Sequence, residues 1–503
     1  METGTGPQTG ETARAQPAAD LGGAARRGRV LLGSLSFTAL SVSVISTLGA
    51  PMVPTIAHDQ HVSLGTAQWI LTVTLLAGAV SGPVLGRLGD GPRRKGAIQA
   101  ALAAVFLGSV LAALAPSFGV LLAGRALQGV GMGLMPLAIA VAREHVHPAL
   151  LRRGVASLSI TTSVGAGLGY PITGLIAQHL DYRAGFWFAA LLTASSFTVV
   201  ARVVPRGSSV PHRPLDTVGA VLLCSGLAAV LLTLSQGTDW GLTSPATLTG
   251  AAAGLVLLVA WVLQALRARH PLVDLRLVRH RAVLAANVAA LLMGVGMYAG
   301  LSLVNLYTQV PSGAGYGFHL SLTLTGVVLM PISLGSLLAN RLASALVGRF
   351  GLYRILPLGA VLCSLDLVVL ALWRHELVVL MVGTFLLGGG VGAAYAAMPV
   401  LIVRSVPAAE TGSATSLNQV LRTVGGSVGS AAISAIMIAY TPAGSSLPPD
   451  HAYSVALWVT AAVSLLGAVA AAVIAGRGAS AATPEPSAVA TGATPIVDRR
   501  QGR

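Results

Sequence analysis

The chain has 503 residues, of which 54% are apolar and only 9% are charged. Soluble domains carry roughly 25% charged residues, so a chain this poor in charge needs lipid rather than water to cover its surface. The formal charge of +15 does not indicate nucleic-acid binding, because the Arg residues stand in short loops between apolar runs and form no basic face. The two cysteines lie inside apolar runs and indicate neither a disulfide framework nor a metal site.

Both ends of the chain are polar and low in complexity. Residues 1–29 are rich in Gly, Ala, Thr and Arg, and residues 476–503 include the run Ala-Thr-Pro-Glu-Pro-Ser. Such composition predicts disordered tails. The apolar run that follows residue 29 is longer than the 7–15 residues of a signal-peptide core. We therefore expect it to remain as the first membrane span.

Apolar runs of span length follow one another along the rest of the chain. A membrane helix needs about 20 mostly apolar residues. The sequence therefore predicts an all-α integral membrane protein with about fourteen transmembrane helices. The expected spans lie near residues 30–53, 66–86, 96–115, 118–142, 154–178, 184–204, 216–236, 246–266, 282–307, 320–342, 354–373, 376–401, 412–439 and 452–475.

The basic residues predict the orientation. An even number of spans places both ends of the chain on one side. If both termini are cytoplasmic, the outer loops hold only Arg183 and Arg374, as the positive-inside rule requires. The single Lys among 31 basic residues, with abundant Ala, suggests a high-GC bacterial genome. We thus expect a multi-pass protein of the bacterial inner (cell) membrane with both termini cytoplasmic.

Three weak internal repeats suggest two homologous halves. The basic turn at 84–95 has a counterpart at 346–354. The other matches are Gly129-x-Gly131 with Gly390-x-Gly392, and Gly165-x-x-x-Gly169 with Gly425-x-x-x-Gly429. Duplicated halves around a central site are typical of secondary transporters. We expect pseudo-symmetric six-helix bundles over residues 30–204 and 282–475, with residues 205–281 as a two-helix insert and its basic loops.

Three motifs give the chain a family resemblance. The first is the basic turn Gly86-Arg-Leu-Gly-Asp90-Gly-Pro-Arg-Arg94-Lys, the second is Arg125-Ala-Leu-Gln128-Gly-Val-Gly, and the third is Gly165-Ala-Gly-Leu-Gly169-Tyr-Pro171-Ile-Thr-Gly174. In this order the motifs resemble those of the major facilitator superfamily, in particular its fourteen-span branch of drug:proton antiporters. Three departures stand out: Arg93 replaces a glycine of the first motif, Pro171 is displaced by one position, and the first span lacks an acid.

The resemblance implies a gate at the basic turn. In the family the acid of this turn lies beside the inner end of a second-half helix and helps to hold the outward-facing state; here Asp90 would lie near Thr411–Gly412. Alternatively, Asp90 and its neighbouring Arg residues are solvated anchors. Glu144 could pair with Arg94 or be a surface acid beside Arg143. The gating residues are Gly86, Asp90, Arg94 and Glu144, and the antiporter motif consists of Gly165, Gly169, Pro171 and Gly174.

Two charged residues within spans are candidates for proton coupling. A charge at membrane depth is costly and is normally functional. The resemblance places Arg125 in the central cavity, although it could instead be a structural residue bonded to backbone carbonyls of the first span. Asp366 lies about 18 Å along its helix from Arg354, near mid-membrane. It could carry a proton or pack against a neighbouring helix.

The resemblance implies a substrate cavity between spans 1, 4, 9 and 12, hence between both halves. The candidate lining residues are Gln128, Tyr298, Asn305, Tyr395, Asn418 and Arg422. Met293, Met297 and Met398 could line the same path, and for them the alternative is ordinary helix packing. For Asn418 and Arg422 it is bonding between helices.

These patterns favour a proton-driven exporter of multiple drugs or a natural product, working by alternating access as a secondary antiporter. Its expected partners are a small amphipathic organic substrate, protons and the lipid bilayer, and we expect a monomer. No phosphate loop or paired-carboxylate site indicates an enzyme, and we expect no cofactor beyond the proton gradient and no metal. The alternatives are a facilitator or importer of a small organic solute and, less favoured, a non-transporting membrane sensor.

Overall fold

The computed structural model describes residues 18–49, 52–62, 64–90, 93–206, 214–241, 243–350, 352–442 and 447–479. Within these ranges the secondary structure is entirely helical. Some side chains inside the helices, including those of Pro171, Gly174 and residues 346–350, are outside the described residues. The second basic turn around Gly351 therefore cannot be compared with the first.

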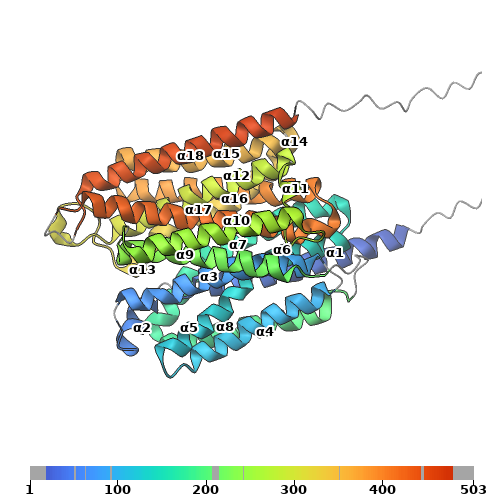
Figure 1. Cartoon of the computed structure of the whole chain (residues 1–503), viewed down its shortest axis with the longest axis horizontal. Helices are drawn as coiled ribbons and strands as arrows, with labels where there is room; N and C mark the ends of the chain where they lie inside the picture. The colour runs from blue at the N-terminus through green and yellow to red at the C-terminus, as the bar shows by residue number, and fades with distance from the viewer. Residues whose placement is uncertain are drawn as a thin grey trace, which may run out of the picture.

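The first part of the chain forms the lower group of helices in Figure 1. Its elements are α1 (Ala18–Thr47), α2 (Val53–Asp59), α3 (Leu64–Gly89), α4 (Arg94–Ala113), α5 (Phe118–Gly129), η2 (Val130–Gly133), α6 (Leu134–His145), α7 (Pro148–His179) and α8 (Tyr182–Val203). Helix α1 begins within the tail that we expected to be disordered. The Ala-rich stretch from Ala18 onward has good helix formers and continues directly into the apolar run.

The rest of the chain forms a second group after a helical hairpin. The elements are α9 (Thr217–Trp240), α10 (Pro245–Arg267), α11 (Leu275–Val278), α12 (Arg281–Thr308), η3 (Ser312–Ala314), α13 (Leu322–Leu329), α14 (Pro331–Phe350), α15 (Leu352–Trp373), α16 (Leu377–Ser405), η4 (Ala408–Glu410), α17 (Thr411–Tyr440) and α18 (Asp450–Ala479).

Twelve helices of the described residues are long and apolar enough to cross a membrane. This count differs from the expected number of about fourteen. The two remaining runs, near 154–178 and 320–342, do form helices: α7 covers the first, and α13 followed by α14 covers the second. The described part of the second run is an apolar helix of only Leu324–Ala339. The described residues thus establish twelve candidate spans.

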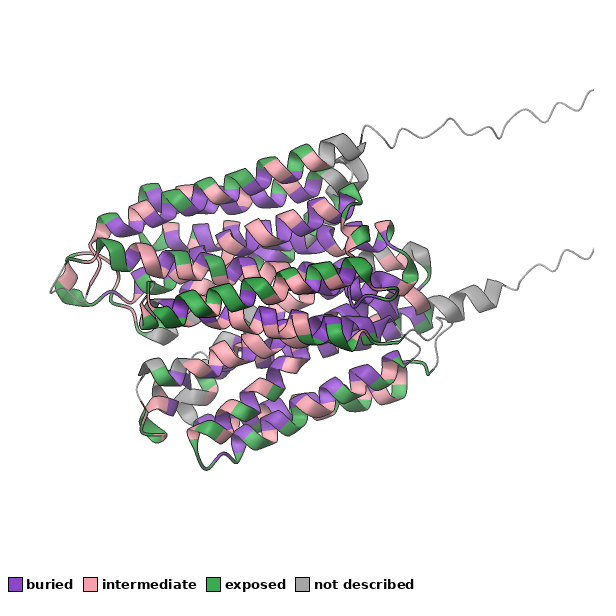
Figure 2. Ribbon diagram, in the orientation of Figure 1, coloured by how far each residue is buried: buried purple, intermediate pink, exposed green. Residues whose placement is uncertain are grey.

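The helices pack into two groups that meet along a few elements. Helix α1 packs against α7 and α8, and α4 packs against α5 and α8. In the second group α12 packs against α17 and α18, while α16 packs against α14 and α15. The groups meet where α3 contacts α17 and where α7 contacts α14 and α16. Figure 2 shows buried residues lining these internal faces, while outward faces are exposed.

The hairpin α9–α10 lies beside this junction. Helix α9 contacts both α3 and α17, whereas α10 packs mainly on α9 and is largely exposed. Asp216 holds the hairpin together at one end: its carboxylate accepts hydrogen bonds from Gly219 N at 2.8 Å, Gln264 Nε2 at 2.9 Å and Leu272 N at 3.1 Å. The hairpin therefore covers the seam between the two groups on one side.

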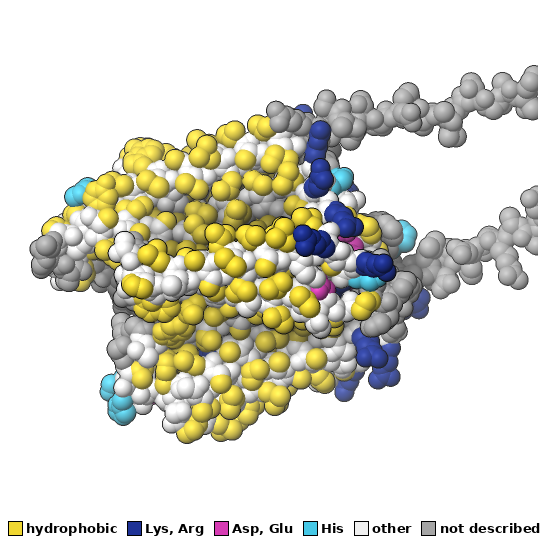
Figure 3. Space-filling view, viewed as in Figure 1, with side chains coloured by type: hydrophobic (Ala, Val, Ile, Leu, Met, Phe, Trp, Pro, Cys, Tyr) yellow, Lys and Arg dark blue, Asp and Glu magenta, His cyan; other side chains and the backbone are white. Residues whose placement is uncertain are grey.

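The charges gather at one end of the bundle. Lys and Arg side chains cluster at the end where α1 begins and α18 ends, whereas the long apolar sides carry yellow side chains (Figure 3). We call this end the basic end. A bundle with an apolar girdle and charges at its end is suited to a bilayer.

Candidate functional site

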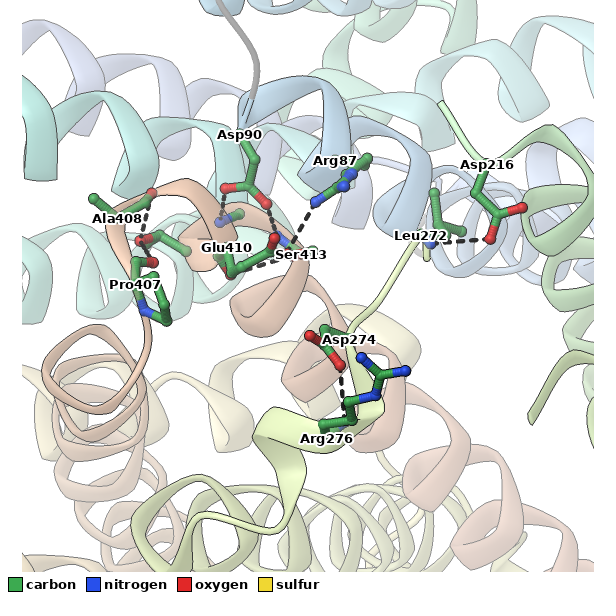
Figure 4. A network of polar contacts seen from close by, with 12 residues as sticks. Arg87, Asp90, Asp216, Leu272, Asp274, Arg276, Pro407, Ala408, Glu410 and Ser413 are labelled. Carbon is green, nitrogen blue, oxygen red and sulfur yellow. Dashed lines mark hydrogen bonds and ion pairs between the residues drawn. The ribbon is translucent and has the colours of Figure 1, made fainter. Parts of the chain in front are cut away.

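Asp90 of the first group caps a helix of the second group. It follows directly on Gly89, where α3 ends, and is 4% exposed. Its carboxylate accepts hydrogen bonds from the backbone N–H groups of Gly412 at 2.5 Å and Ser413 at 2.8 Å (Figure 4). These N–H groups belong to the first turn of α17 and have no partner within the helix. The contact expected between Asp90 and the beginning of this span is therefore present.

A buried ion pair lies beside this cap. Arg87 Nη1 donates to Glu410 Oε2 at 2.9 Å, and both side chains are buried. Ser413 Oγ also donates to the Glu410 carboxylate, at 3.2 Å. Glu410 is not among the site residues that the sequence predicts. Its position immediately before Thr411, at the start of a span, could have indicated that it takes part in this contact.

Gly86 allows the two helices to approach this closely. A Cβ atom at Gly86 would lie 2.6 Å from the carbonyl oxygen of Gly412 and 2.6 Å from Ser416 Cβ. Backbone atoms cannot yield as a flexible side chain can, so any larger residue would push α3 and α17 apart. We refer to Gly86, Arg87, Asp90, Glu410 and the first turn of α17 as the latch.

Of the two possibilities considered for Glu144, the structure shows the pair with Arg94. Arg94 Nη1 donates to a Glu144 carboxylate oxygen and to the carbonyl of Ala140, both on α6. This pair braces α4 against α6 within the first group. The neighbouring Arg143, which we had not assigned to the gate, instead crosses to the second group: it donates to Val406 O at 2.8 Å and to Thr411 Oγ1.

The environment of Asp90 shifts its titration toward neutral pH. Burial raises the pKa of the carboxyl from an ordinary value of 3.8 to about 7, with a smaller contribution from the negative charge of Glu410. The hydrogen bonds from Ser413 and Gly412 act in the opposite direction, since they favour the carboxylate, but they are outweighed. The latch therefore contains a carboxyl group that can gain or lose a proton near neutrality.

Arg125 and Gln128 lie within the packing of the first group. Arg125 is fully buried and donates to Ile70 O at 3.1 Å, Ile45 O at 3.3 Å and Gln128 Oε1 at 2.6 Å. Gln128 in turn donates to Ser109 Oγ at 2.8 Å. The carbonyl of Ile45 belongs to α1, so the arrangement is the structural alternative that we considered for Arg125. Gln128 bonds α5 to α4, where we had expected it to line a cavity.

Asp366 is buried among close-packed helices. It is 1% exposed, and among the described residues neither carboxylate oxygen has a hydrogen-bond partner. A Cβ atom at Gly383 of α16 would lie 2.7 Å from its Oδ1, and one at Gly300 of α12 would lie 3.7 Å from its Oδ2. The carboxyl thus faces two glycines and packs against α12 and α16.

The expected cavity residues of the second group separate into three places. Arg422 lies over the ring of Tyr395, 4.1 Å from its centroid, and Tyr298 lies one turn further along, against Gly426. Asn418 is buried and donates to Ala286 O at 2.9 Å and Asn287 Oδ1 at 3.1 Å, which bonds α17 to α12. Asn305 is exposed near the other end of α12 and bonds to Gln309 of the same helix, so it does not join the other residues.

The glycines of the antiporter motif bring α7 against α1. A Cβ atom at Gly165 would lie 2.9 Å from Leu40 O, and one at Gly169 would lie 3.0 Å from Val44 O. Gly425 and Gly429 approach the carbonyls of α12 in the same way. The contact of α7 with α1 is thus repeated by α17 with α12. The described residues contain no cluster of three potential metal ligands.

The structure has two groups of membrane-length helices with repeated internal contacts, and a polar latch joins the groups at the basic end. This arrangement is typical of the secondary transporters. The chain matches the model of the Major Facilitator Superfamily over residues 35–430 and again over residues 311–500, and it belongs to that family. Family membership makes it a membrane transporter rather than an enzyme.

The similar proteins include bacterial drug exporters. The chain is 28% identical over 405 residues to the multidrug resistance protein B homolog of Mycobacterium tuberculosis, covering 79% of this chain and 73% of the relative. It is 27% identical to the multidrug efflux pump LfrA of Mycolicibacterium smegmatis, with 82% of each covered. It is 28% identical to the tetracenomycin C resistance and export protein of Streptomyces glaucescens, covering 79% of this chain and 74% of the relative.

The fold is shared with solved transporters. The crystal structure of the human organic anion transporter MFSD10 (TETRAN) superposes with a TM-score of 0.64 at 16% identity, covering 91% of this chain and 100% of that one. At this identity the likeness concerns the fold alone.

Proposed function

We propose that the protein is a proton-driven exporter of small amphipathic organic compounds in a bacterial cell membrane. The similarity to multidrug and tetracenomycin C exporters supports export and this class of substrate. The latch is the single observation that carries the mechanism: Asp90 of one helix group caps α17 of the other. Such a contact between groups has to break and re-form if access alternates.

The proposed topology has fourteen crossings. The twelve candidate spans are joined by α7, whose 32 residues would reach about 48 Å, and by the consecutive helices α13 and α14. Helices α9 and α10 form the two-helix insert between bundles over residues 30–204 and 282–475. The beginning of α1 and the end of α18 at the basic end support placing both termini in the cytoplasm.

The proposed conformation is outward-facing. If the basic end is cytoplasmic, the latch, the Arg87–Glu410 pair and the bonds from Arg143 all close the cytoplasmic side. Export then proceeds by rocking of the two bundles, and Gly86, Asp90, Arg94 and Glu144 act as gating residues. The monomer contains both halves of this gate.

The proton is proposed to be carried by an acid other than one of the first span, which has none. Asp366 is the candidate, because it is a buried carboxyl at mid-depth that no described residue satisfies. Asp366→Asn should weaken the pH dependence of efflux. An unaltered pH profile would leave a packing role as the better account. Arg125 is proposed to influence coupling by holding α1, α3 and α5 together.

Efflux from energised vesicles tests the function. Inverted membrane vesicles would be loaded by respiration-driven uptake of a panel of dyes: ethidium, rhodamine B and carboxyfluorescein. At least one dye should accumulate, and a proton uncoupler should abolish its accumulation. Vesicles with an equal amount of the Asp90→Asn variant serve as the matched control for the latch. Equilibration that an uncoupler does not affect would indicate a facilitator, and absence of movement of every dye would contradict export.

A further inference from the structure

The middle of the membrane holds very few charges in this protein. Away from the ends of the candidate spans, the charged side chains of the described residues are those of Arg125, Asp366 and Arg422, and the exposed Arg341 lies midway along α14. Arg125 is 0% exposed and Asp366 is 1% exposed, so neither is open to a solute. Arg422 is only partly buried. The charge that a solute can reach at this depth is therefore positive.

Aromatic residues position the Arg422 guanidinium. The ring of Tyr395 on α16 lies beneath it at 4.1 Å. The Tyr395 hydroxyl donates to Met297 Sδ at 3.4 Å, which fixes the ring against α12. Tyr298 packs against Gly426, one turn further along α17. Stacking on a ring face orients the planar guanidinium and leaves its N–H groups free at the edge.

Arg422 lies immediately beyond the closed contact between the two helix groups. It is eleven residues from Thr411, or about 16 Å along α17 from the basic end. Gln419, three residues earlier and hence on a neighbouring part of the same helix face, donates to Met132 O of the first group at 2.9 Å. Ser416 lies a further turn back, against Gly82 and Gly86. The contact between the groups thus proceeds from the latch to Gln419. Arg422 follows on α17, where its own contacts are with Tyr395 of α16 and with α12.

No acid in the described part of the chain compensates the charge of Arg422. Among the described residues no carboxylate forms an ion pair with Arg422, and none of its nitrogens makes a hydrogen bond. By contrast, the arginines that cross between the groups are paired: Arg87 with Glu410, and Arg143 with Val406 O and Thr411 Oγ1. An accessible, oriented and unpaired guanidinium is suited to a ligand that brings its own negative charge.

We propose that Arg422, flanked by Tyr395 and Tyr298, binds the anionic group of the transported compound, and that the substrate class is amphipathic aromatic carboxylates and similar organic oxyanions. The guanidinium edge matches a carboxylate through two parallel N–H···O bonds. The partly exposed ring of Tyr298 offers an apolar surface to the aromatic part of the same molecule, while the buried ring of Tyr395 supports the guanidinium. This proposal rests on the proposed export function and names its substrate.

A pair of dyes that differ only at a carboxylate tests the proposal. Rhodamine B has a free carboxylate, and its ethyl ester does not. Binding of each dye to the purified full-length protein in detergent would be measured by fluorescence anisotropy. The wild type should bind rhodamine B more tightly than the ester. Arg422→Gln should weaken rhodamine B binding roughly tenfold or more, the size expected for a lost charged hydrogen bond, and leave the ester unchanged. Arg422→Lys should retain part of the difference.

Arg404→Gln is the matched control, because it removes a positive charge from an exposed position at the end of α16. It should leave both affinities unchanged. Equal losses for both dyes in Arg422→Gln would indicate a packing role and overturn the proposal, as would a wild type that fails to bind rhodamine B or that prefers the ester.

Transport in proteoliposomes with a pH gradient separates this proposal from export itself. Gradient-driven movement of rhodamine B but not of the ester supports both. Movement of the ester alone leaves export standing and overturns anion recognition. If the gradient drives neither dye although both bind, the proposed export function fails while the binding site stands.

Discussion

Asp90 and Glu410 show how single residues make the contact between the two helix groups specific. The buried Asp90 carboxylate accepts a hydrogen bond from Gly412 N of the second group. The buried Glu410 carboxylate accepts one from Arg87 of the first group. A buried charge without partners is strongly unfavourable. The closed arrangement is therefore specific: sliding α3 by one residue along α17 would leave both carboxylates and Arg87 uncompensated.

Asp90→Asn tests this specificity. An asparagine side chain has one acceptor oxygen, so it can satisfy only one of the N–H groups of Gly412 and Ser413 and turns its own N–H₂ toward the other. We expect export to fall about tenfold, corresponding to about 1.4 kcal/mol, with normal abundance in the membrane. Dye efflux rates per amount of protein measure the effect. Asp181→Asn, at an exposed N-cap of α8, is the control, and export equal to that of wild type would sink the gating role.

Arg125 illustrates a buried charge in a structural setting. Arg125→Met removes donors from the carbonyls of Ile70 and Ile45 and from Gln128. Because each buried acceptor left unsatisfied costs about 1–3 kcal/mol, we expect a lower melting temperature in detergent and reduced abundance. A variant that melts as the wild type does but loses proton-linked efflux would instead assign Arg125 a direct role in coupling.

At the scale of elements, glycine determines how closely α3 and α17 approach. Gly86→Ala adds a methyl group that meets the backbone of Gly412, and overpacking of this kind costs about 1–3 kcal/mol. Gly96→Ala, on α4, adds the same group where nothing lies within 4 Å. We expect Gly86→Ala to weaken the latch and slow export, whereas Gly96→Ala keeps wild-type export. Equal export rates of the two variants would show that the close approach at Gly86 is dispensable.

Hydropathy could predict where elements lie because every span needs a long apolar run, and most helix ends fall within a few residues of the expected ones. The pattern could not show that the fourth run divides into α5, η2 and α6. That division depends on contacts: a Cβ at Gly129 would meet Thr74 of α3, and one at Gly133 would meet Leu85. Tertiary packing, rather than local sequence, determines such a distortion.

A contact at the candidate site could be predicted only where the family resemblance or the order of neighbouring helix ends related its two residues. Asp90 could be placed beside Gly412 from the family resemblance, and Arg94 beside Glu144 from their positions at neighbouring helix ends. Glu410 and Arg143 were missed, since each lies in a short loop or last turn whose partner is more than 250 residues away. Hydropathy and periodicity carry no information on such long-range pairs.

On the scale of the whole molecule, the latch couples the relative position of the two bundles to the protonation of the Asp90 carboxyl group. In the latched state the pKa of Asp90 is about 7, raised by burial from an ordinary 3.8. When the bundles separate, Asp90 meets water and its pKa should return toward the ordinary value. Between these two values the latched state binds more protons than the open state. The latch is therefore favoured as the pH falls below about 7, and this contribution is lost as the pH rises through about 7, above which both states have released the proton.

This dependence on pH predicts a movement of the two bundles that can be measured. Spin labels at Leu88 on α3 and Arg404 on α16, both exposed near the basic end, report the separation of the bundles in a variant without Cys224 and Cys363. Lowering the pH from about 8 to about 6 should increase the short-distance population. The same labels in Asp90→Asn should give distances that do not depend on pH over this range, because the titrating group is absent. A short-distance population that falls with pH in the wild type, or an equal response in Asp90→Asn, would show that another group controls the closure of this end and that Asp90 holds the bundles together without sensing protons.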